Sequence, residues 1–441
     1  MRSQIFSQES FCYTLPCSEE EFLNLTSHFS EDEGTILLHS AAERGATRRC
    51  SYLAVQPKDK IVISANGSEE PWKALDFWVG DRLKDLPCLG YLSYEMGHHI
   101  DPTWKIPTCR SPLPLAIFYR YESIFVFDPV SESLAVWAQS SAPNSLIDVI
   151  KREKWRRFAC ESVESSNWQF SHGSDTREGY LEKVRVLQEG ILSGDVYQAN
   201  LSQLFAYKGD EAHFSLYRRL IRLNPAPYAA YLRLPSHSVI SLSPELFVQR
   251  SGETIKTSPI KGTAPRSDDV SEDLSNKSKL LSSQKERAEL LMITDLMRND
   301  FAAISEVGSI RVLHECVCES FRDVYHLISH VQGVLRPDLS PVQILKSLFP
   351  AGSITGCPKI RAMQWIAQLE KRARGIYTGS IGVIRDRENF EFNVAIRTLQ
   401  LTGGYLELQL GGGVVTDSDP LSEYEETLHK GRSFFDCLKR R

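Results

Sequence analysis

The chain has 441 residues, of which 42% are hydrophobic and 24% are charged, and its formal net charge is −5. This length indicates two lobes or one large multilayered body, and the composition is ordinary for a soluble globular protein. The negative balance offers no basic face, so a nucleic-acid partner is not expected. Residues 1–17 lack the apolar core of a signal peptide, and no apolar run approaches the ~18 residues of a membrane span, so no membrane partner is expected.

The ten cysteines are scattered along the chain without a Cys-x-x-Cys pair. Zinc binding and thioredoxin-like chemistry are therefore weakly supported, and a disulfide scaffold of this length is improbable. We expect reduced thiols and a cytoplasmic location.

The first third of the chain is predicted to be rich in β-structure. Short runs of β-branched and aromatic residues predict strands at residues 35–38, 60–64, 116–127 and 134–138. The proline-rich residues 102–114 predict a loop, and the charged residues 145–158 predict a helix. The polar residues 162–174 are the best candidate for a linker.

From residue 177 onward the pattern changes. Residues 177–192 have the spacing of an amphipathic helix that Gly194 would end. Further strands are predicted at residues 196–207, 324–335, 375–384, 390–401 and 405–410. Further helices are predicted at residues 283–297, 341–349, 359–373 and 421–438. Strands and helices mix without regular βαβ alternation, which favours an α+β fold over a doubly wound α/β fold.

Two pairs of glutamates stand on predicted helices. Glu286 and Glu289 form one pair, Glu423 and Glu426 form the other, and the spacing places each pair on one helix face. If the two faces met, their carboxylates would surround one point, and oxygen ligands suit Mg²⁺. Either pair alone is better explained as a solvated helix face, and the spacing does not show that the helices meet.

Arg397 lies in a run that is predicted to be a mostly buried strand. A buried guanidinium is costly unless it is paired, and a carboxylate is its natural partner. That carboxylate could belong to a ligand or, with about equal weight, to an internal salt bridge.

Glycine turns and two basic side chains are further candidates. Gly411, Gly412 and Gly413 could let the backbone approach an anion, although such turns are common. Lys261, between proline, glycine and threonine, is either a site residue or a turn lysine. His326 could face a site, but on this feature alone a satisfied core histidine is favoured.

Several motifs in one order resemble the chorismate-utilising enzymes, a family that includes anthranilate, aminodeoxychorismate, isochorismate and salicylate synthases. The motifs are Gly194-Asp-Val-Tyr-Gln-Ala-Asn-Leu-Ser, Ser243-Pro-Glu-Leu-Phe, Pro259-Ile-Lys-Gly-Thr, Glu286-Arg-Ala-Glu, Asp295-Leu-Met-Arg-Asn-Asp, Gly352-Ser-Ile-Thr-Gly-Cys-Pro-Lys, Gly375-Ile-Tyr-Thr-Gly-Ser-Ile-Gly, Ala395-Ile-Arg-Thr, Gly411-Gly-Gly-Val-Val and Glu423-Tyr-Glu-Glu-Thr. They extend from about residue 177 to residue 437. Leu37-Leu-His-Ser and Gly90-Tyr-Leu-Ser-Tyr resemble the first part of the aminodeoxychorismate synthases.

The resemblance implies a magnesium site and a bound chorismate. Glu289 and Glu426 would be the main Mg²⁺ ligands, with Glu286 and Glu423 close behind them. The ion would hold the ring carboxylate of chorismate.

The resemblance also implies roles for the residues around that ion. The implied carboxylate contacts are Lys430, Gly411, Gly412 and Gly413 for the ring carboxylate and Arg397 and Tyr377 for the enolpyruvyl carboxylate. Gln198 and Thr355 would also bind the substrate, and His326 would lie near the leaving hydroxyl. Glu245 would be the general acid that protonates this hydroxyl.

Two positions sort the members of this family. Isochorismate and salicylate synthases have a lysine that activates water where this chain has Gln198, which cannot act as that base. Anthranilate synthases normally have alanine where this chain has Lys261, as the aminodeoxychorismate synthases do. We therefore expect amination at carbon 4 of chorismate, with Lys261 as an intermediate nucleophile.

Other partners are implied as well. The chain has no glutaminase signature, so a separate glutamine amidotransferase subunit would supply ammonia, and a separate aminodeoxychorismate lyase would act downstream. The surroundings of the tryptophan site of many relatives differ at residues 47–50, so tryptophan binding is not expected. The loop after Asp300 also differs, without removing any residue assigned above. Alternatives are an anthranilate synthase, less favourably an isochorismate synthase, and a non-catalytic regulatory subunit that binds a metabolite.

The implied fold is an α+β body of two packed β-sheets with outer helices and the active site in the cleft between the layers. A β-rich N-terminal region would cover residues 1–160, and a chorismate-binding catalytic domain would cover residues 177–437. The two parts are expected to share the sheets.

Overall fold

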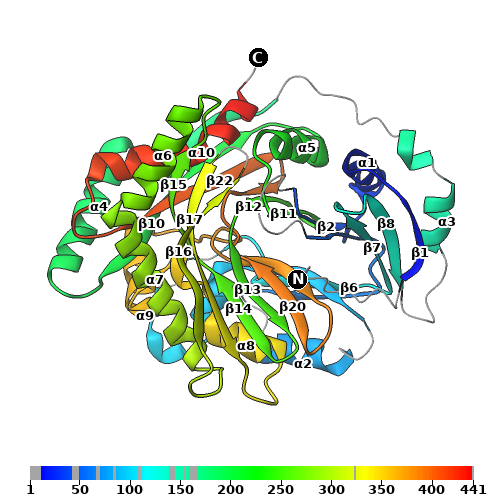
Figure 1. The fold of residues 1–441 in the computed structure, drawn as a ribbon, viewed down its shortest axis with the longest axis horizontal. Helices are drawn as coiled ribbons and strands as arrows, with labels where there is room; N and C mark the ends of the chain where they lie inside the picture. Colours follow the sequence, from blue (N-terminus) through cyan, green and yellow to red (C-terminus); the bar gives the residue numbers. More distant parts are fainter. Residues whose placement is uncertain are drawn as a thin grey trace.

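The computed structural model of the protein describes residues 11–41, 49–65, 70–82, 86–107, 109, 111–138, 145–152, 154–157, 167–321 and 324–439. Two large antiparallel sheets dominate these residues (Figure 1). In spatial order, the first sheet contains β1 (Phe11–Pro16), β8 (Ser133–Ala138), β7 (Ser123–Asp128), β3 (Ser51–Ala54), β2 (Ile36–His39), β11 (Tyr228–Arg233), β12 (Ser238–Ser243), β21 (Thr398–Thr402), β22 (Tyr405–Val414), β10 (Gln198–Lys208) and β18 (Gly356–Cys357), with β9 (Gln169–Gly173) also on β10.

The second sheet contains strands from both parts of the chain, as the first one does. Its order is β15 (Ile260–Pro265), β17 (Val324–Val334), β14 (Thr254–Ser258), β13 (Leu246–Ser251), β20 (Asn389–Asn393), β19 (Ser380–Ile384), β5 (Cys88–Leu92), β6 (Ala116–Arg120) and β4 (Asp59–Ile63), with β16 (Arg311–Ser320) also on β17. Strands from before residue 140 and after residue 177 therefore hydrogen-bond within the same sheets.

Helices cover the outer faces of both sheets. The helices are α1 (Glu19–Phe29), α2 (Pro71–Arg82), α3 (Ser145–Lys151), α4 (Arg177–Leu192), α5 (His213–Leu223), α6 (Val270–Ser282), α7 (Gln284–Ala302), α8 (Pro341–Leu348), α9 (Lys359–Glu370) and α10 (Pro420–Leu438). In Figure 1, α1, α5 and α10 lie above the first sheet, and α2 and α8 lie below the second. No helix in the described ranges is long and apolar enough to cross a membrane.

Three apolar cores hold these layers together. One core lies between the sheets and contains Tyr52 of β3 and Tyr91 of β5. A second packs α1, α5 and α10 on the first sheet, and a third packs α2, α7 and α8 on the second. Burial of these apolar faces, rather than helix propensity, is what stabilises such elements. The expected α+β fold of two packed sheets with outer helices is confirmed.

The chain passes from one sheet to the other at points that the sequence reading treated as continuous strands. Residues 390–401 were predicted as one strand, but β20 ends at Asn393 in the second sheet and β21 begins at Thr398 in the first. Residues 116–127 divide in the same way into β6 and β7. The continuous prediction was wrong because a buried apolar run looks the same in either sheet.

Other predictions also need correction. The strand predicted at residues 405–410 continues as β22 to Val414, so Gly411–Gly413 form part of a strand and not a turn. Residues 375–379 form a turn rather than the start of β19, and Gly375 and Thr378 have left-handed φ values of 63° and 60°. α9 ends at Glu370, three residues early, and Lys371 has a φ of 53°. Part of the expected linker is strand β9, although residues 158–166 lie outside the described ranges. Helix α4 has the predicted bounds, because an N-cap at Thr176 and an apolar stripe both mark it.

Candidate active site

Two of the candidate residues lie where the chain changes sheets. Glu245 follows β12 and precedes β13, and Arg397 lies between β20 and β21 with a φ of 52°. These two crossings bind each other, since the amide of Val394 donates to the carbonyl of Glu245 at 3.0 Å. The Ser243 hydroxyl also donates to the Val394 carbonyl at 2.6 Å. Backbone hydrogen bonds therefore join the two crossings that carry the predicted general acid and the predicted arginine.

Glu245 has the environment of a carboxylic acid that stays protonated near neutrality. Its side chain is buried, and the Ser353 hydroxyl donates to Oε1 at 2.6 Å. Burial raises the pKa of Glu245 to about 7, against the opposing effects of the Ser353 hydrogen bond and the charge of Lys261. A group with this pKa can donate a proton at physiological pH.

Arg397 is a cation without an internal counterion. No ion pair to its guanidinium occurs in the part of the chain that the structure describes, so the salt bridge considered from the sequence is not found. Burial lowers the pKa of Arg397. Arg397 is half-buried. Partial burial of an unpaired guanidinium is unfavourable, and a carboxylate from a ligand would compensate for it.

His326 lies next to Arg397 and is a neutral imidazole. Its Nδ1 lies 3.0 Å from the Thr263 hydroxyl and 3.3 Å from the carbonyl oxygen of Gly262. Burial, with the nearby charge of Arg397, lowers the pKa of His326 to about 3. The other ring nitrogen has no hydrogen-bond partner among the described residues and can contact an uncharged group such as a hydroxyl.

Lys261 meets Gln198 and the glycine-rich strand at one point. It lies on β15 rather than in a turn, at a bulge before Gly262, where φ is 70°. A Cβ atom added to Gly413 would collide with the Gln198 amide and approach the Lys261 Nζ to 3.2 Å. The charge of Lys261 also acts on the nearby Glu245 carboxyl. The amine therefore lies beside both Gln198 and the candidate general acid.

Gly412 and the carbonyl of Gly411 face the last helix. A Cβ atom on Gly412 would approach Glu423 Oε2 to 3.0 Å and Lys430 Nζ to 3.8 Å. Lys430 donates to the carbonyl of Gly411 at 2.9 Å and pairs with Glu426 at 2.6 Å. Burial alone would lower the pKa of Lys430, but the pairing with Glu426 outweighs it and raises this pKa.

The two glutamate pairs approach one another from α7 and α10, which lie on the same side of the molecule in Figure 1. Burial raises the pKa of Glu289, and the charges of Glu286 and Glu423 raise it further. Burial also raises the pKa of Glu423, whose Oε1 accepts from Ser418 at 2.6 Å. Its buried Oε2 has no hydrogen-bond partner among the described residues. Glu289 and Glu423 are therefore partly or fully withdrawn from solvent, whereas the Glu426 side chain is 49% exposed.

This donor set fits a divalent cation in chemistry. Several carboxylate oxygens that face one another and one orphaned buried oxygen are what a hard cation such as Mg²⁺ would neutralise. No three acidic, histidine or cysteine groups in the described ranges are gathered closely enough to form a metal site as they stand. The side chains would have to close around an ion.

Tyr377 and Thr355 lie on the other side of Gly411. A Cβ atom on Gly411 would approach the Tyr377 hydroxyl to 2.9 Å. The Thr355 hydroxyl donates to the carbonyls of Ala351 and Gly352, and its own carbonyl accepts from the amide of Asn200 at 2.8 Å. Thr355 is thus buried in the wall of the site, with its hydroxyl already bonded to its own loop.

The sequence reading missed several side chains that hold these groups. They are Ser353 on Glu245, Ser418 on Glu423, Thr263 beside His326, and Asn200 between Gln198 and Ser202. Ser353 lies within a quoted motif, but nothing in its spacing shows that it reaches a glutamate more than 100 residues away in the sequence. Spacing reveals only local pairs.

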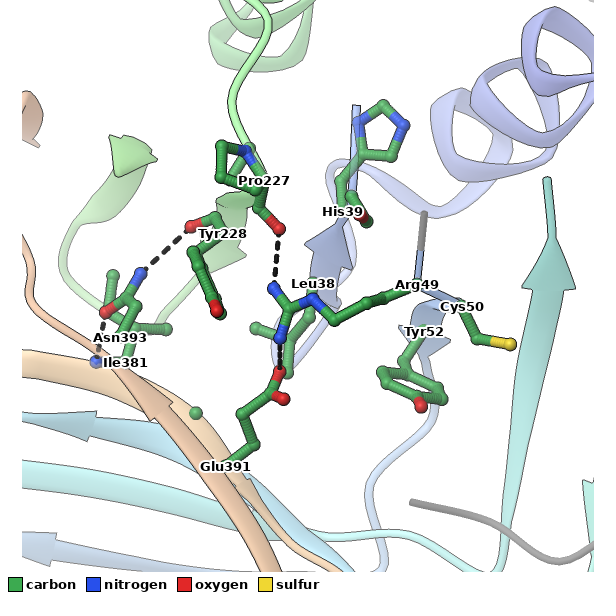
Figure 2. Close-up of a pocket in the computed structure, with 13 residues that line it drawn as sticks. Leu38, His39, Arg49, Cys50, Tyr52, Pro227, Tyr228, Ile381, Glu391 and Asn393 are labelled. Carbon is green, nitrogen blue, oxygen red and sulfur yellow. Dashed lines mark hydrogen bonds and ion pairs between the residues drawn. The ribbon is translucent and has the colours of Figure 1, made fainter. Parts of the chain in front are cut away.

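A pocket lies away from these residues, lined by residues of β2 and β11 among others (Figure 2). Arg49 extends across it, donates to the carbonyl of Pro227 at 2.7 Å and pairs with Glu391 of β20 at 2.5 Å. Its guanidinium carbon lies 3.6 Å from the centre of the Tyr228 ring. Arg49 belongs to residues 47–50, of which Thr47 and Arg48 lie outside the described ranges.

Comparison with known proteins decides the family. The family model described as "chorismate binding enzyme" matches residues 34–436, which is most of the chain. The chain belongs to the chorismate-binding enzymes.

The individual relatives carry the names of two different synthases, so they do not settle the reaction. The chain is 46% identical over 435 residues to aminodeoxychorismate synthase component 1 of Klebsiella aerogenes, with 92% of this chain and 93% of the relative covered. It is 33% identical to anthranilate synthase component 1 of Streptomyces coelicolor, with 93% and 84% covered. The structure of anthranilate synthase component I from Streptococcus pneumoniae superposes with a TM-score of 0.77 at 29% identity and covers 91% of this chain and 94% of that one.

Proposed function

We propose that this chorismate-binding enzyme is the large subunit of an aminodeoxychorismate synthase. The observation that carries the proposal is the place of Lys261, whose amine lies beside Gln198 and Gly413 and near the buried acid Glu245. An amine nucleophile and a proton donor are the two groups that amination at carbon 4 through a covalent intermediate requires. Relatives of this name at up to 46% identity agree with it.

The chemistry proceeds in two displacements. The uncharged Lys261 amine adds at carbon 2 of chorismate, the double bond shifts, and the carbon 4 hydroxyl leaves as water with the proton of Glu245. Ammonia then adds at carbon 4, the double bond shifts back, and the Lys261 amine leaves carbon 2. The new ammonium group gives one proton to the Glu245 carboxylate, which restores the acid. The net change exchanges hydroxyl for amino, so chorismate and ammonia give 4-amino-4-deoxychorismate and water.

The remaining residues hold the substrate for these steps. Arg397 and Tyr377 bind the enolpyruvyl carboxylate, and Lys430 with the amides of Gly411–Gly413 binds the ring carboxylate. His326, uncharged at neutral pH, contacts the departing hydroxyl. Bound Mg²⁺, held by Glu286, Glu289, Glu423 and Glu426, would neutralise the ring carboxylate and the acidic side chains.

Two partner proteins complete the proposed pathway. A glutamine amidotransferase subunit would deliver ammonia, and a separate aminodeoxychorismate lyase would release pyruvate to form para-aminobenzoate for folate synthesis. The competing proposal is an anthranilate synthase, which the 33% identical relative of that name favours. Lys261 argues against it, because direct amination at carbon 2 needs no protein nucleophile.

The deciding experiment identifies the product. The purified chain is incubated with chorismate, Mg²⁺ and ammonium at mildly alkaline pH, with and without an aminodeoxychorismate lyase. Para-aminobenzoate that forms only with the lyase supports the proposal. Anthranilate would overturn the specificity argument from Lys261, and isochorismate or salicylate would overturn the one from Gln198.

Substitution of the nucleophile tests the covalent route. Lys261→Ala is expected to lower amination by more than about 10³-fold, because the first displacement loses its nucleophile. Lys256→Ala is the matched control, since Lys256 is an exposed lysine on β14, the strand that precedes β15 in the chain. Undiminished aminodeoxychorismate from the Lys261 variant, measured by coupled formation of para-aminobenzoate, would refute the role of Lys261.

A further inference from the structure

One buried arginine behind the site has every donor engaged. The Arg374 side chain is 1% exposed. It makes five hydrogen bonds, two to the carboxylate of Glu370, one to the carbonyl of Asn200, one to the carbonyl of Ile354 and one to the hydroxyl of Thr378. Arginine has five N–H donors in a rigid fork, so this set uses the full capacity of the guanidinium.

Each of the other three acceptors lies close in sequence to a proposed substrate-binding residue. Asn200 lies on β10 between Gln198 and Ser202, Ile354 immediately precedes Thr355, and Thr378 immediately follows Tyr377. The corresponding distances from the guanidinium nitrogens are 2.6 Å, 3.1 Å and 3.3 Å. Arg374 therefore binds three separate segments that each carry a proposed substrate-binding residue.

The guanidinium is itself fixed in place. Glu370, at the end of α9, accepts from Nε and Nη2 of Arg374 at 3.0 Å and 2.8 Å, which is bidentate geometry. The backbone amides of Arg374 and Gly375 donate to Glu95 at 2.7 Å and 3.0 Å. The Arg374 guanidinium carbon also lies 4.8 Å from the centre of the Tyr94 ring. The position of the guanidinium thus sets the position of the three segments.

We infer that Arg374 is the positioning residue of this site, which holds the Gln198, Thr355 and Tyr377 segments in register for the substrate without touching the substrate. The inference rests on the proposed function only in that the substrate is chorismate. Lysine could not take this role, because its point charge has three donors and no planar fork with which to bridge Glu370 and three other acceptors.

Arg372 provides a matched control in the same charge network. It also donates to Glu370, at 3.0 Å, and its other bonds go to Ser202 and Gln409. None of these bonds reaches the Ile354 or Thr378 segment. A lysine at either position keeps the positive charge beside Glu370. The two variants therefore differ in whether the hydrogen bonds to the Ile354 and Thr378 segments are lost.

The test compares Arg374→Lys with Arg372→Lys in the full chain, by the KM and kcat for chorismate consumption at saturating ammonium and Mg²⁺. Arg374→Lys is expected to raise KM by about 10-fold to 100-fold, because a displacement of ~1 Å in the binding groups can weaken an enzyme by such a factor. Arg372→Lys is expected to change KM by less than about 3-fold. A KM within about 3-fold of wild type for Arg374→Lys, or equal effects of both variants, would overturn the inference.

A milder variant keeps the test decisive if Arg374→Lys does not fold, as judged by circular dichroism. Thr378→Ala removes one acceptor and is expected to raise KM by about 3-fold to 10-fold with the thermal midpoint retained, whereas an unchanged KM would overturn the inference. Chorismate consumption is measured whatever the product is. Failure of the proposed amination would appear in the wild-type product, and failure of the positioning role would appear in the comparison of variants.

Discussion

At the scale of single residues, Glu245 carries the most specific chemical expectation. Its carboxyl must be protonated to release water from carbon 4, and burial raises its pKa to about 7. The rate constant kcat/KM for chorismate is therefore expected to fall about tenfold per pH unit above pH 7, at a constant concentration of unprotonated ammonia. In Glu245→Gln this descending limb should be absent, and kcat/KM should be lower by about 10²-fold to 10⁴-fold.

Stability measurements on the same variant separate the buried charge from the chemistry. The folded pKa of Glu245 lies above its ordinary value of 4.5, so ionisation opposes folding increasingly as pH rises from about 4.5 to about 7. At pH 8 the unfolding free energy of Glu245→Gln should therefore exceed that of wild type by up to about 3 kcal/mol. Below pH ~4.5 the two proteins should be nearly equal in stability. Equal unfolding free energies at pH 8 in urea titrations would contradict the assigned burial.

At the scale of elements, Arg49 joins the two sheets (Figure 2). It bonds the Pro227 carbonyl before β11 in the first sheet and Glu391 on β20 in the second. Arg49→Ala would leave the half-buried Glu391 with only its hydrogen bond from Gln249. A loss of about 3 kcal/mol or more in unfolding free energy is expected, because the remaining charge lacks its counterion.

An exposed ion pair serves as the reference for that prediction. Arg185 pairs with Glu182 on α4 at 3.2 Å, and both side chains are more than half exposed. Arg185→Ala is expected to cost less than about 1 kcal/mol in the same urea titration. If Arg49→Ala costs no more than Arg185→Ala, then Arg49 does not join the sheets energetically.

Prediction from sequence succeeded where an element carries its own signals and failed where the signal is long-range. Helix α4 could be predicted from its N-cap and apolar stripe. The crossings that place Glu245 and Arg397 could not, because a buried run has no mark for the sheet to which it belongs. Glu370 and Arg374 have the local spacing of a helical pair, but the sequence does not show that Arg374 also reaches three distant segments.

The candidate site was likewise predictable in residue types but not in contacts. Motifs named Lys261, Glu245 and Arg397 through the resemblance to a family. Three-dimensional packing alone shows that Ser353 binds Glu245 and that Arg397 has no acidic partner in the described ranges. The alternating faces of β22 were hidden too, since Gly412 faces α10 whereas Gly413 faces Lys261.

At the scale of the whole molecule, the glutamates of α7 and α10 bring like charges together between elements that are distant in sequence. Burial and mutual repulsion raise the pKa values of Glu289 and Glu423, and Glu423 Oε2 has no hydrogen-bond partner in the described ranges. A cation that binds between the helices should stabilise the folded chain by mass action. The expected gain is about 2.7 kcal/mol at a Mg²⁺ concentration 100 times Kd.

Thermal unfolding at increasing MgCl2, against NaCl of equal ionic strength, measures this gain without any substrate. The midpoint is expected to rise with Mg²⁺ but not with NaCl, since screening alone affects exposed charges only. Glu423→Gln should abolish the rise, whereas Glu425→Gln, an exposed glutamate on the same helix, should retain it. Equal midpoints in both salts for the wild type would mean that no metal binds between the two helices, and their charges would then be balanced by lysines such as Lys430, Lys261 and Lys285.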